Sequence, residues 1–238
     1  MTFPFDLPDD DAAREAGPGP LGDDRAAAGA PGRRIVSVSA GTSQPSSTQM
    51  LADRLGQATV TALREQGVAA EVTTVDLRDH AHDILNAMLT GVRTGALEDA
   101  MSATASADGL VVTTPVYSGS YSGLLKMFLD ILDQGAIDGT PLLIGATGGT
   151  PRHSLAIDYA VRPLVAYLRG RAMSTGVYAA TDDWAGDAEG RDGGSLPGRI
   201  ARAGGELATA VAAADPRNTA DEFDAVPDFS SMLRSMGA

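Results

Sequence analysis

Five short apolar segments divide the chain at regular intervals. They cover residues 33–39, 70–77, 109–115, 139–147 and 171–180, and their length and content are typical of buried strands. Between them, apolar residues recur at helical spacing. The helical sets are Met50, Leu51, Leu55, Ala58, Ala62 and Leu63 before Gly67; Leu124, Leu125, Phe128, Leu129 and Leu132; Leu155, Tyr159, Leu164, Val165 and Leu168; and residues 196–213, with a weaker helical stretch ending near Ala107. The alternation predicts an α/β protein with one doubly wound parallel sheet.

Polar loops follow the first, third and fourth predicted strands. The third strand is expected to end at Pro115 and to continue as a loop of Ser, Gly and Tyr through Gly123. Five strands fit the flavodoxin-like order 2-1-3-4-5, a three-layer sandwich in which these three strands are neighbours. Ligands bind in such folds outside the carboxyl ends of the strands, so the sequence predicts one site built from three loops.

The first loop is rich in hydroxyl groups and opens a helix. Besides Ser39, it holds Thr42, Ser43, Ser46, Ser47 and Thr48. A helix N-terminus presents unpaired backbone N–H groups and the positive end of its dipole, which together favour a bound phosphate. Simple N-capping would need only one of these residues, and this alternative stays open. The loop matches neither the Walker P-loop nor the dinucleotide fingerprint.

The other two loops offer backbone rather than charged side chains. Residues 115–123 carry no charge, so they suit a flat polar ligand better than a phosphate alone. Gly148 and Gly149 follow the fourth strand, where glycines allow close approach to a ligand or simply form a tight turn. No acid–base dyad is visible in these loops, and we predict no catalytic residue.

Histidines at 80 and 82 alternate with Asp79 and Asp83, which raises the question of a metal site. No third group of ligands accompanies them, so we interpret the segment as a solvated loop and predict no metal. Residues 181–195 form a long loop around the only tryptophan, and a loop of that length is often a lid or a contact surface.

Composition sets the remaining limits. The net charge of −13 argues against nucleic acid, no apolar run is long enough to span a membrane, and no secretory signal or cysteine is present, which together predict a cytoplasmic protein. Residues 1–32 hold seven acids against two arginines, and ten of them are Pro or Gly. We predict a disordered acidic leader at 1–32, a compact domain at 33–214 and an acidic tail at 215–238.

At its three loops the sequence resembles the NADPH-dependent FMN reductase family. Residues 39–48 are similar to the family's phosphate loop, and residues 114–126 to its flavin loop, Pro-x-Tyr-x-Gly-Ser-x-Ser-Gly-x-x-Lys. Residues 146–155 resemble the branch whose members accompany luciferase-like monooxygenases. The resemblance spans roughly residues 33–213.

The resemblance implies a residue set for FMN. The phosphate would be held by Ser39, Ser46, Ser47 and Thr48; the isoalloxazine would be lined by Pro115, Val116, Tyr117, Ser118, Gly119 and Ser120; and Thr147, Gly148 and Gly149 would close over its polar edge. Many relatives carry an arginine in the phosphate loop where this chain has Gln44. The phosphate would therefore rest on neutral donors and the helix dipole.

The resemblance also implies an activity and partners. The expected enzyme is an NAD(P)H-dependent FMN reductase that uses NADPH or NADH and passes reduced flavin to a flavin-dependent monooxygenase or to oxygen, as a homodimer or homotetramer. Two alternatives stay open: a quinone or azo reductase with tightly bound FMN, and a flavodoxin-like electron carrier. Arg152 is expected either at the nicotinamide cofactor's phosphate or at the sheet edge, and Lys126 with Asp130 either as a surface ion pair or at a subunit interface.

Overall fold

A computed structural model describes residues 32–184 and 194–217 of the 238-residue chain. Residues 1–31 of the predicted leader, most of the predicted tail and part of the loop at 181–195 lie outside these residues. None of the described helices has the length and apolar content needed to cross a membrane.

The core of the fold is a parallel sheet. Its strands are β1 (Arg33–Ser39), β2 (Ala70–Asp76), β3 (Gly109–Tyr117) and β5 (Pro141–Gly148), continued at the far edge by β6 (Arg171–Ala172) and β7 (Val177–Ala180). The order is β2-β1-β3-β5, with β6 and β7 both pairing in parallel with β5. The predicted order 2-1-3-4-5 is therefore confirmed.

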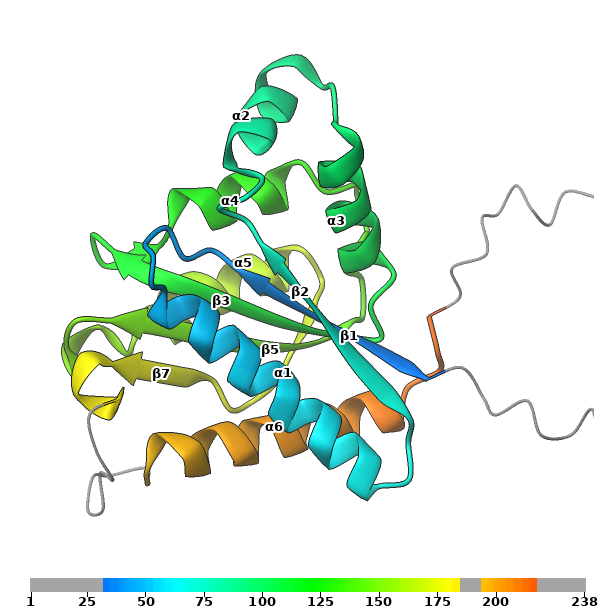
Figure 1. The fold of residues 1–238 in the computed structure, drawn as a ribbon, viewed down its shortest axis with the longest axis vertical. Helices are drawn as coiled ribbons and strands as arrows, with labels where there is room; N and C mark the ends of the chain where they lie inside the picture. The colour runs from blue at the N-terminus through cyan, green and yellow to red at the C-terminus, as the bar shows by residue number, and fades with distance from the viewer. Residues whose placement is uncertain (1–31, 185–193, 218–238) are drawn as a thin grey trace, which may run out of the picture. The chain divides into compact units, whose positions relative to one another are not determined.

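Helices cover both faces of the sheet, which confirms the three-layer sandwich (Figure 1). One face packs on α1 (Ser47–Glu65) and α6 (Leu196–Ala212), around a core that includes Leu55, Val111 and Leu207. The other face packs on α2 (Ala81–Thr90), α3 (Gly95–Ala105), α4 (Gly123–Asp130) and the helical segment after β5. The central strands β3 and β5 are buried on both sides, so they carry continuous apolar runs, whereas the edge strand β2 is partly exposed and alternates with polar residues.

The third strand does not end at Pro115, so the predicted strand end is wrong. It continues to Tyr117 and turns back as β4 (Ser120–Tyr121), an antiparallel hairpin. The backbone N–H of Ala40 donates to the Thr113 carbonyl, so the nitrogen two residues later, at Pro115, faces the side on which β1 has already ended. Proline therefore removes no ladder hydrogen bond, and the strand tolerates it.

Four further segments differ from the sequence prediction. The fifth strand is interrupted between β6 and β7, and the weak stretch before 107 is two separate helices, α2 and α3. The predicted helix over 155–168 is a π-helical turn (Ile157–Val161) followed by α5 (Arg162–Tyr167), and a 3₁₀ turn (Pro151–His153) precedes it. The long loop begins as a 3₁₀ turn, Thr181–Trp184, with the Arg54 guanidinium 5.1 Å from the Trp184 ring.

Candidate functional site

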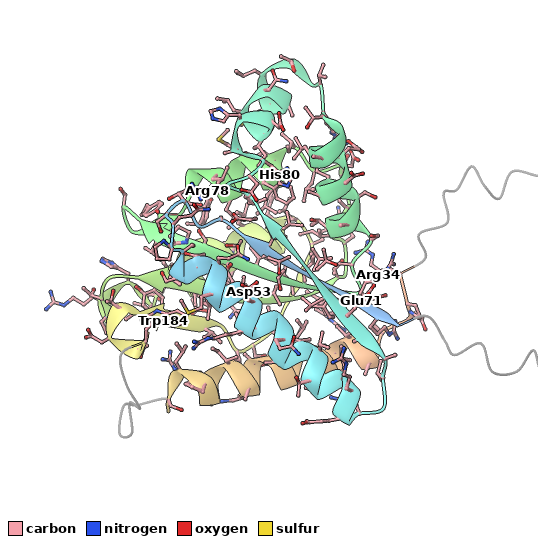
Figure 2. All side chains as sticks on the ribbon, viewed as in Figure 1. Arg34, Asp53, Glu71, Arg78, His80 and Trp184 are labelled. Atoms are coloured by element: carbon pink, nitrogen blue, oxygen red, sulfur yellow. The ribbon has the colours of Figure 1, made fainter. Side chains whose placement is uncertain are left out.

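Three loops leave the sheet at the same edge. The register places Ser39 opposite Thr113, and Thr113 opposite Gly145, so β1, β3 and β5 end side by side. Trp184 marks this end of the sheet, and Arg34, at the start of β1, lies at the opposite end (Figure 2). The predicted meeting of the three loops is therefore confirmed.

The first loop leads into a long helix, and several backbone N–H groups there have no hydrogen-bond acceptor among the described residues. The Ser46 side chain caps α1 by accepting from the Gln49 N–H at 3.1 Å, and the first turn of this 19-residue helix has no acidic residue. Among the described residues, no acceptor meets the backbone N–H groups of residues 42–44 and 46–48. Unpaired N–H groups at the positive end of a helix dipole favour an anion.

Gly41 is required for this arrangement. A Cβ at position 41 would overlap the Ser46 hydroxyl and lie 3.2 Å from the Thr48 Cβ. The space beside Gly41 is therefore filled by the capping side chain, and the loop folds closely over the helix N-terminus.

The second loop is a tight hairpin fixed to the first. Ser118 and Gly119 form its two-residue turn with φ of 50° and 81°, the positive-φ pattern of a type I′ connection. The Thr114 hydroxyl accepts from the Ser122 N–H at 2.9 Å, which closes the base of the hairpin. Near its tip, the Tyr117 hydroxyl lies 2.7 Å from that of Thr42, so the hairpin and the first loop are joined directly.

The third loop is joined to the start of α1. The hydroxyls of Thr48 and Thr147 lie 2.7 Å apart, and both residues are buried. Beyond them, the backbone N–H groups of Gly149 and Thr150 meet no acceptor within the described chain. The carbonyl of Thr150 accepts from the Tyr178 hydroxyl at 2.8 Å, which ties the loop to β7.

The residues proposed for ligand binding divide by exposure. Ser39, Thr48, Pro115 and Thr147 are buried beneath the loops, and the others are exposed or half-buried: Ser46, Ser47, Val116, Tyr117, Ser118, Gly119, Ser120, Gly148 and Gly149. The Ser39 hydroxyl faces the N–H of Gly41, at 3.5 Å. The buried members shape the loops from below, and the exposed members form the surface that a ligand would meet.

The loops are almost free of charge. Residues 40–48, 115–123 and 147–154 contain no carboxylate, and their only permanent charge is that of Arg152, which is exposed after the third loop. Backbone N–H groups and hydroxyls therefore dominate the site, with the α1 dipole adding positive potential. Such a surface can hold a flat polar molecule that ends in an anion.

Other candidate residues lie outside this surface. His80 precedes α2 and His82 lies exposed on it, and no three metal-ligating side chains gather anywhere in residues 32–184 or 194–217. Lys126 and Asp130 form an exposed ion pair on α4, with 2.6 Å between nitrogen and oxygen. The surface ion pair is confirmed, and a role at a subunit interface stays a prediction.

Sequence reasoning missed the roles of Tyr178 and Thr114. Both act through partners that only the fold supplies: Thr114 closes the hairpin, and Tyr178 reaches the third loop from another strand. A tyrosine inside an otherwise small-residue strand, Val177–Ala180, was the available signal. Its hydroxyl is buried in β7 and needs a partner, because Tyr O–H groups usually find one when buried.

Comparison with known proteins gives a consistent result. Residues 33–185 match the sequence profile of the NADPH-dependent FMN reductase family. The chain is 36% identical over 151 residues to an FMN reductase (NADPH) from Pseudomonas aeruginosa. The aligned residues cover 63% of this chain and 78% of that protein. It is also 36% identical over 152 residues to the NADH-dependent FMN reductase SfnF of Pseudomonas fluorescens, over 64% of this chain and 79% of that one.

Solved structures agree with the sequence comparisons. An oxidoreductase from Corynebacterium diphtheriae superposes with a TM-score of 0.73 at 46% identity, over 77% of this chain and 99% of that one. The apo form of an NADH:FMN oxidoreductase, EMOB, superposes with a TM-score of 0.65 at 29% identity, over 78% and 94% of the two chains.

Proposed function

Because the chain belongs to the NADPH-dependent FMN reductase family, we propose that it transfers hydride from NADPH or NADH to FMN held at the three loops. We further propose that the reduced flavin then passes to a flavin-dependent monooxygenase. The family match over residues 33–185 supports the first step. The monooxygenase partner rests on the resemblance of residues 146–155 to the branch that accompanies such enzymes.

The observation that carries the proposal is the set of unpaired donors at the start of α1. The N–H groups of residues 42–44 and 46–48 fit the phosphate of FMN, and the exposed hydroxyls of Thr42 and Ser47 lie in the same segment. This arrangement supports phosphate binding by Ser46, Ser47 and Thr48, with Ser39 beneath them.

The other two loops would hold the ring. In this proposal the hairpin from Pro115 to Ser120 lies along the isoalloxazine, and Thr147, Gly148 and Gly149 face its polar edge. The free N–H groups of Gly149 and Thr150 are donors of the kind that can hydrogen-bond carbonyl groups of the ring. When bound, FMN itself accepts the hydride, so the protein needs to supply binding and orientation. Loops without carboxylates are consistent with this division of work.

The flavin is proposed to exchange freely. Gln44 stands where many relatives carry an arginine, so the phosphate would meet neutral donors only. An arginine would add a positive charge and a bidentate pair of hydrogen bonds to the phosphate, and its absence weakens retention. This distinguishes the proposed reductase from a quinone or azo reductase that keeps its FMN bound.

We also propose a homo-oligomer, as the resemblance implies. Exposed apolar side chains gather on α2 and just after it: Leu85, Met88, Leu89 and Val92, of which Leu89 is 77% exposed. Light scattering on the purified protein tests this, and a monomer at micromolar concentration would refute it.

The test of the function uses purified protein with NADPH or NADH and, in turn, FMN, FAD, riboflavin and a quinone. We expect nicotinamide oxidation with FMN, FMN loss on desalting, and FMN binding at least about 10-fold tighter than riboflavin because of the phosphate donors. Protein that oxidises neither nicotinamide with FMN refutes the proposal. Retention of FMN through desalting together with quinone turnover favours the quinone reductase instead.

A variant checks that the phosphate is held where we propose. Gly41→Ala should push the Ser46 hydroxyl away from its cap and weaken FMN binding about 10-fold, because the donors of this loop lose their arrangement. Riboflavin lacks the phosphate, so its affinity should stay within about two-fold. An equal loss for both ligands would contradict the placement.

A further inference from the structure

The third loop is supported from beneath by one buried phenol. Tyr178 lies in β7, opposite Ala146 of β5, and is 7% exposed. Its hydroxyl donates to the Thr150 carbonyl at 2.8 Å, one residue beyond the two glycines. The peptide that follows Thr150 is therefore held in place, and the free N–H groups of Gly149 and Thr150 lie directly before that anchor.

Gly148 makes this support possible. A Cβ at position 148 would overlap the Tyr178 hydroxyl and lie 3.1 Å from its ring carbon Cζ. By contrast, a Cβ at Gly149 would meet nothing within 4 Å. The first glycine thus gives the phenol its space, and the second has open space where a side chain would lie.

Tyr178 is itself fixed by a partly buried network. The Arg199 guanidinium donates to the Tyr178 carbonyl at 2.5 Å and lies 3.0 Å from the Asp183 carboxylate. That carboxylate accepts from the Ala180 N–H at 2.8 Å, which closes the network onto β7. Burial, with a smaller contribution from Asp183, raises the pKa of Tyr178, so the phenol stays protonated and remains a donor.

We infer that Tyr178 is a positioning residue for the flavin: its hydroxyl holds the Gly148–Thr150 loop so that the Gly149 and Thr150 N–H groups face the bound ring. The inference rests on the proposed function. Tyr178 touches no reacting atom; it acts through the loop. Removing the hydroxyl should therefore change FMN affinity more than the rate at saturating FMN.

The first experiment compares Tyr178→Phe with wild type and with Tyr167→Phe. The control loses the same atom from a tyrosine that is 84% exposed on α5. We expect the Kd and KM for FMN to rise about five-fold in Tyr178→Phe, the net value of one hydrogen bond, while kcat at saturating FMN stays within about two-fold. The control should match wild type in all three quantities. An unchanged FMN Kd in Tyr178→Phe overturns the inference, even if its melting temperature falls.

The second experiment tests the coupling between Gly148 and the phenol. Gly148→Ala in wild type should weaken FMN binding strongly, because the new methyl displaces the hydroxyl and the loop with it. In the Tyr178→Phe background the same substitution should cost several-fold less, since the overlapping oxygen is gone. Equal losses in both backgrounds would show that the two positions act independently and would also overturn the inference.

The outcomes separate this inference from the proposed function. Wild-type protein that binds no FMN refutes the function and the inference together. Wild-type protein that binds and reduces FMN, with Tyr178→Phe indistinguishable from it, refutes the inference alone.

Discussion

The buried hydroxyl pair of Thr48 and Thr147 offers a direct test of how the site is joined to the core. The two residues are 99 positions apart, are 2% and 3% exposed, and place their hydroxyls 2.7 Å from each other. Replacing one threonine by valine keeps the volume but leaves the other hydroxyl buried without this partner. Replacing both removes the two polar groups together.

The magnitudes follow from the cost of an orphaned polar group. A buried donor or acceptor left unsatisfied costs about 1–3 kcal/mol, whereas exchanging both partners for apolar groups of the same shape is nearly neutral. Thr48→Val and Thr147→Val should therefore each lower the free energy of unfolding by about 1.5 kcal/mol. The double variant should lie within about 1 kcal/mol of wild type. For a domain of this size, each single loss corresponds to roughly 3–6 °C in Tm.

Urea denaturation of the flavin-free protein, followed by circular dichroism, measures the free energy of unfolding of wild type, the two single variants and the double variant, which form a double-mutant cycle. Single losses of about 1.5 kcal/mol each and a double loss within about 1 kcal/mol correspond to a favourable coupling of at least about 2 kcal/mol between the two positions, well above the scatter of independent sites. If the double variant loses the sum of the two single losses, the hydroxyls do not form the pair and the third loop is not joined to α1 in this way. The slope with urea should stay constant, because the folded state exposes the same surface in each variant.

Three further predictions concern the hairpin, the far end of the sheet and acid stability. Gly119→Ala should lower the free energy of unfolding by about 1 kcal/mol, because φ is 81° there, while Gly123→Ala, with open space and no positive φ, should stay within about 0.5 kcal/mol; equal urea midpoints would contradict this. Asp108→Ala should cost about 3 kcal/mol in the same assay, because this buried carboxylate accepts from the Arg217 N–H at 2.7 Å and lies beside two arginines; a loss below about 1 kcal/mol would show that water replaces it. Burial alone would raise the pKa of Glu206, but hydrogen bonds from residues 174 and 175 lower it, so this carboxylate contributes stability at neutral pH that is lost as the pH falls through the lowered pKa. Glu206→Gln should then reduce the loss in free energy of unfolding between pH 7 and pH 3, and an unchanged dependence on pH would contradict this.

The fold was largely predictable because local pattern and global architecture agree. Five apolar runs alternate with helical patterns, and a parallel sheet covered on both faces follows from that alternation. The errors occurred where local patterns compete with tertiary pairing. Pro115 suggested a strand end, yet it lies where β1 has already stopped and no hydrogen bond is lost.

The boundary at 214 remains a prediction, and several contacts of residues 214 and 217 bear on it. The Arg217 N–H donates to Asp108, and the Ala214 carbonyl accepts from Arg33, so contacts with the start of the sheet continue beyond the last helix. Periodicity cannot show such contacts, because they involve single polar groups far apart in sequence.

The sequence by itself determined the sheet order, the edge at which the three loops meet and the chemistry of the loops, since strand content, helix spacing and hydroxyl-rich segments are local properties. Only the tertiary structure decided how the loops are held. Thr48 meets Thr147, Thr42 meets Tyr117, and Tyr178 meets Thr150 through hydrogen bonds between segments that are 28 to 99 residues apart. Such bonds depend on which side chains the folded backbone brings within about 3 Å, and no local pattern contains that distance.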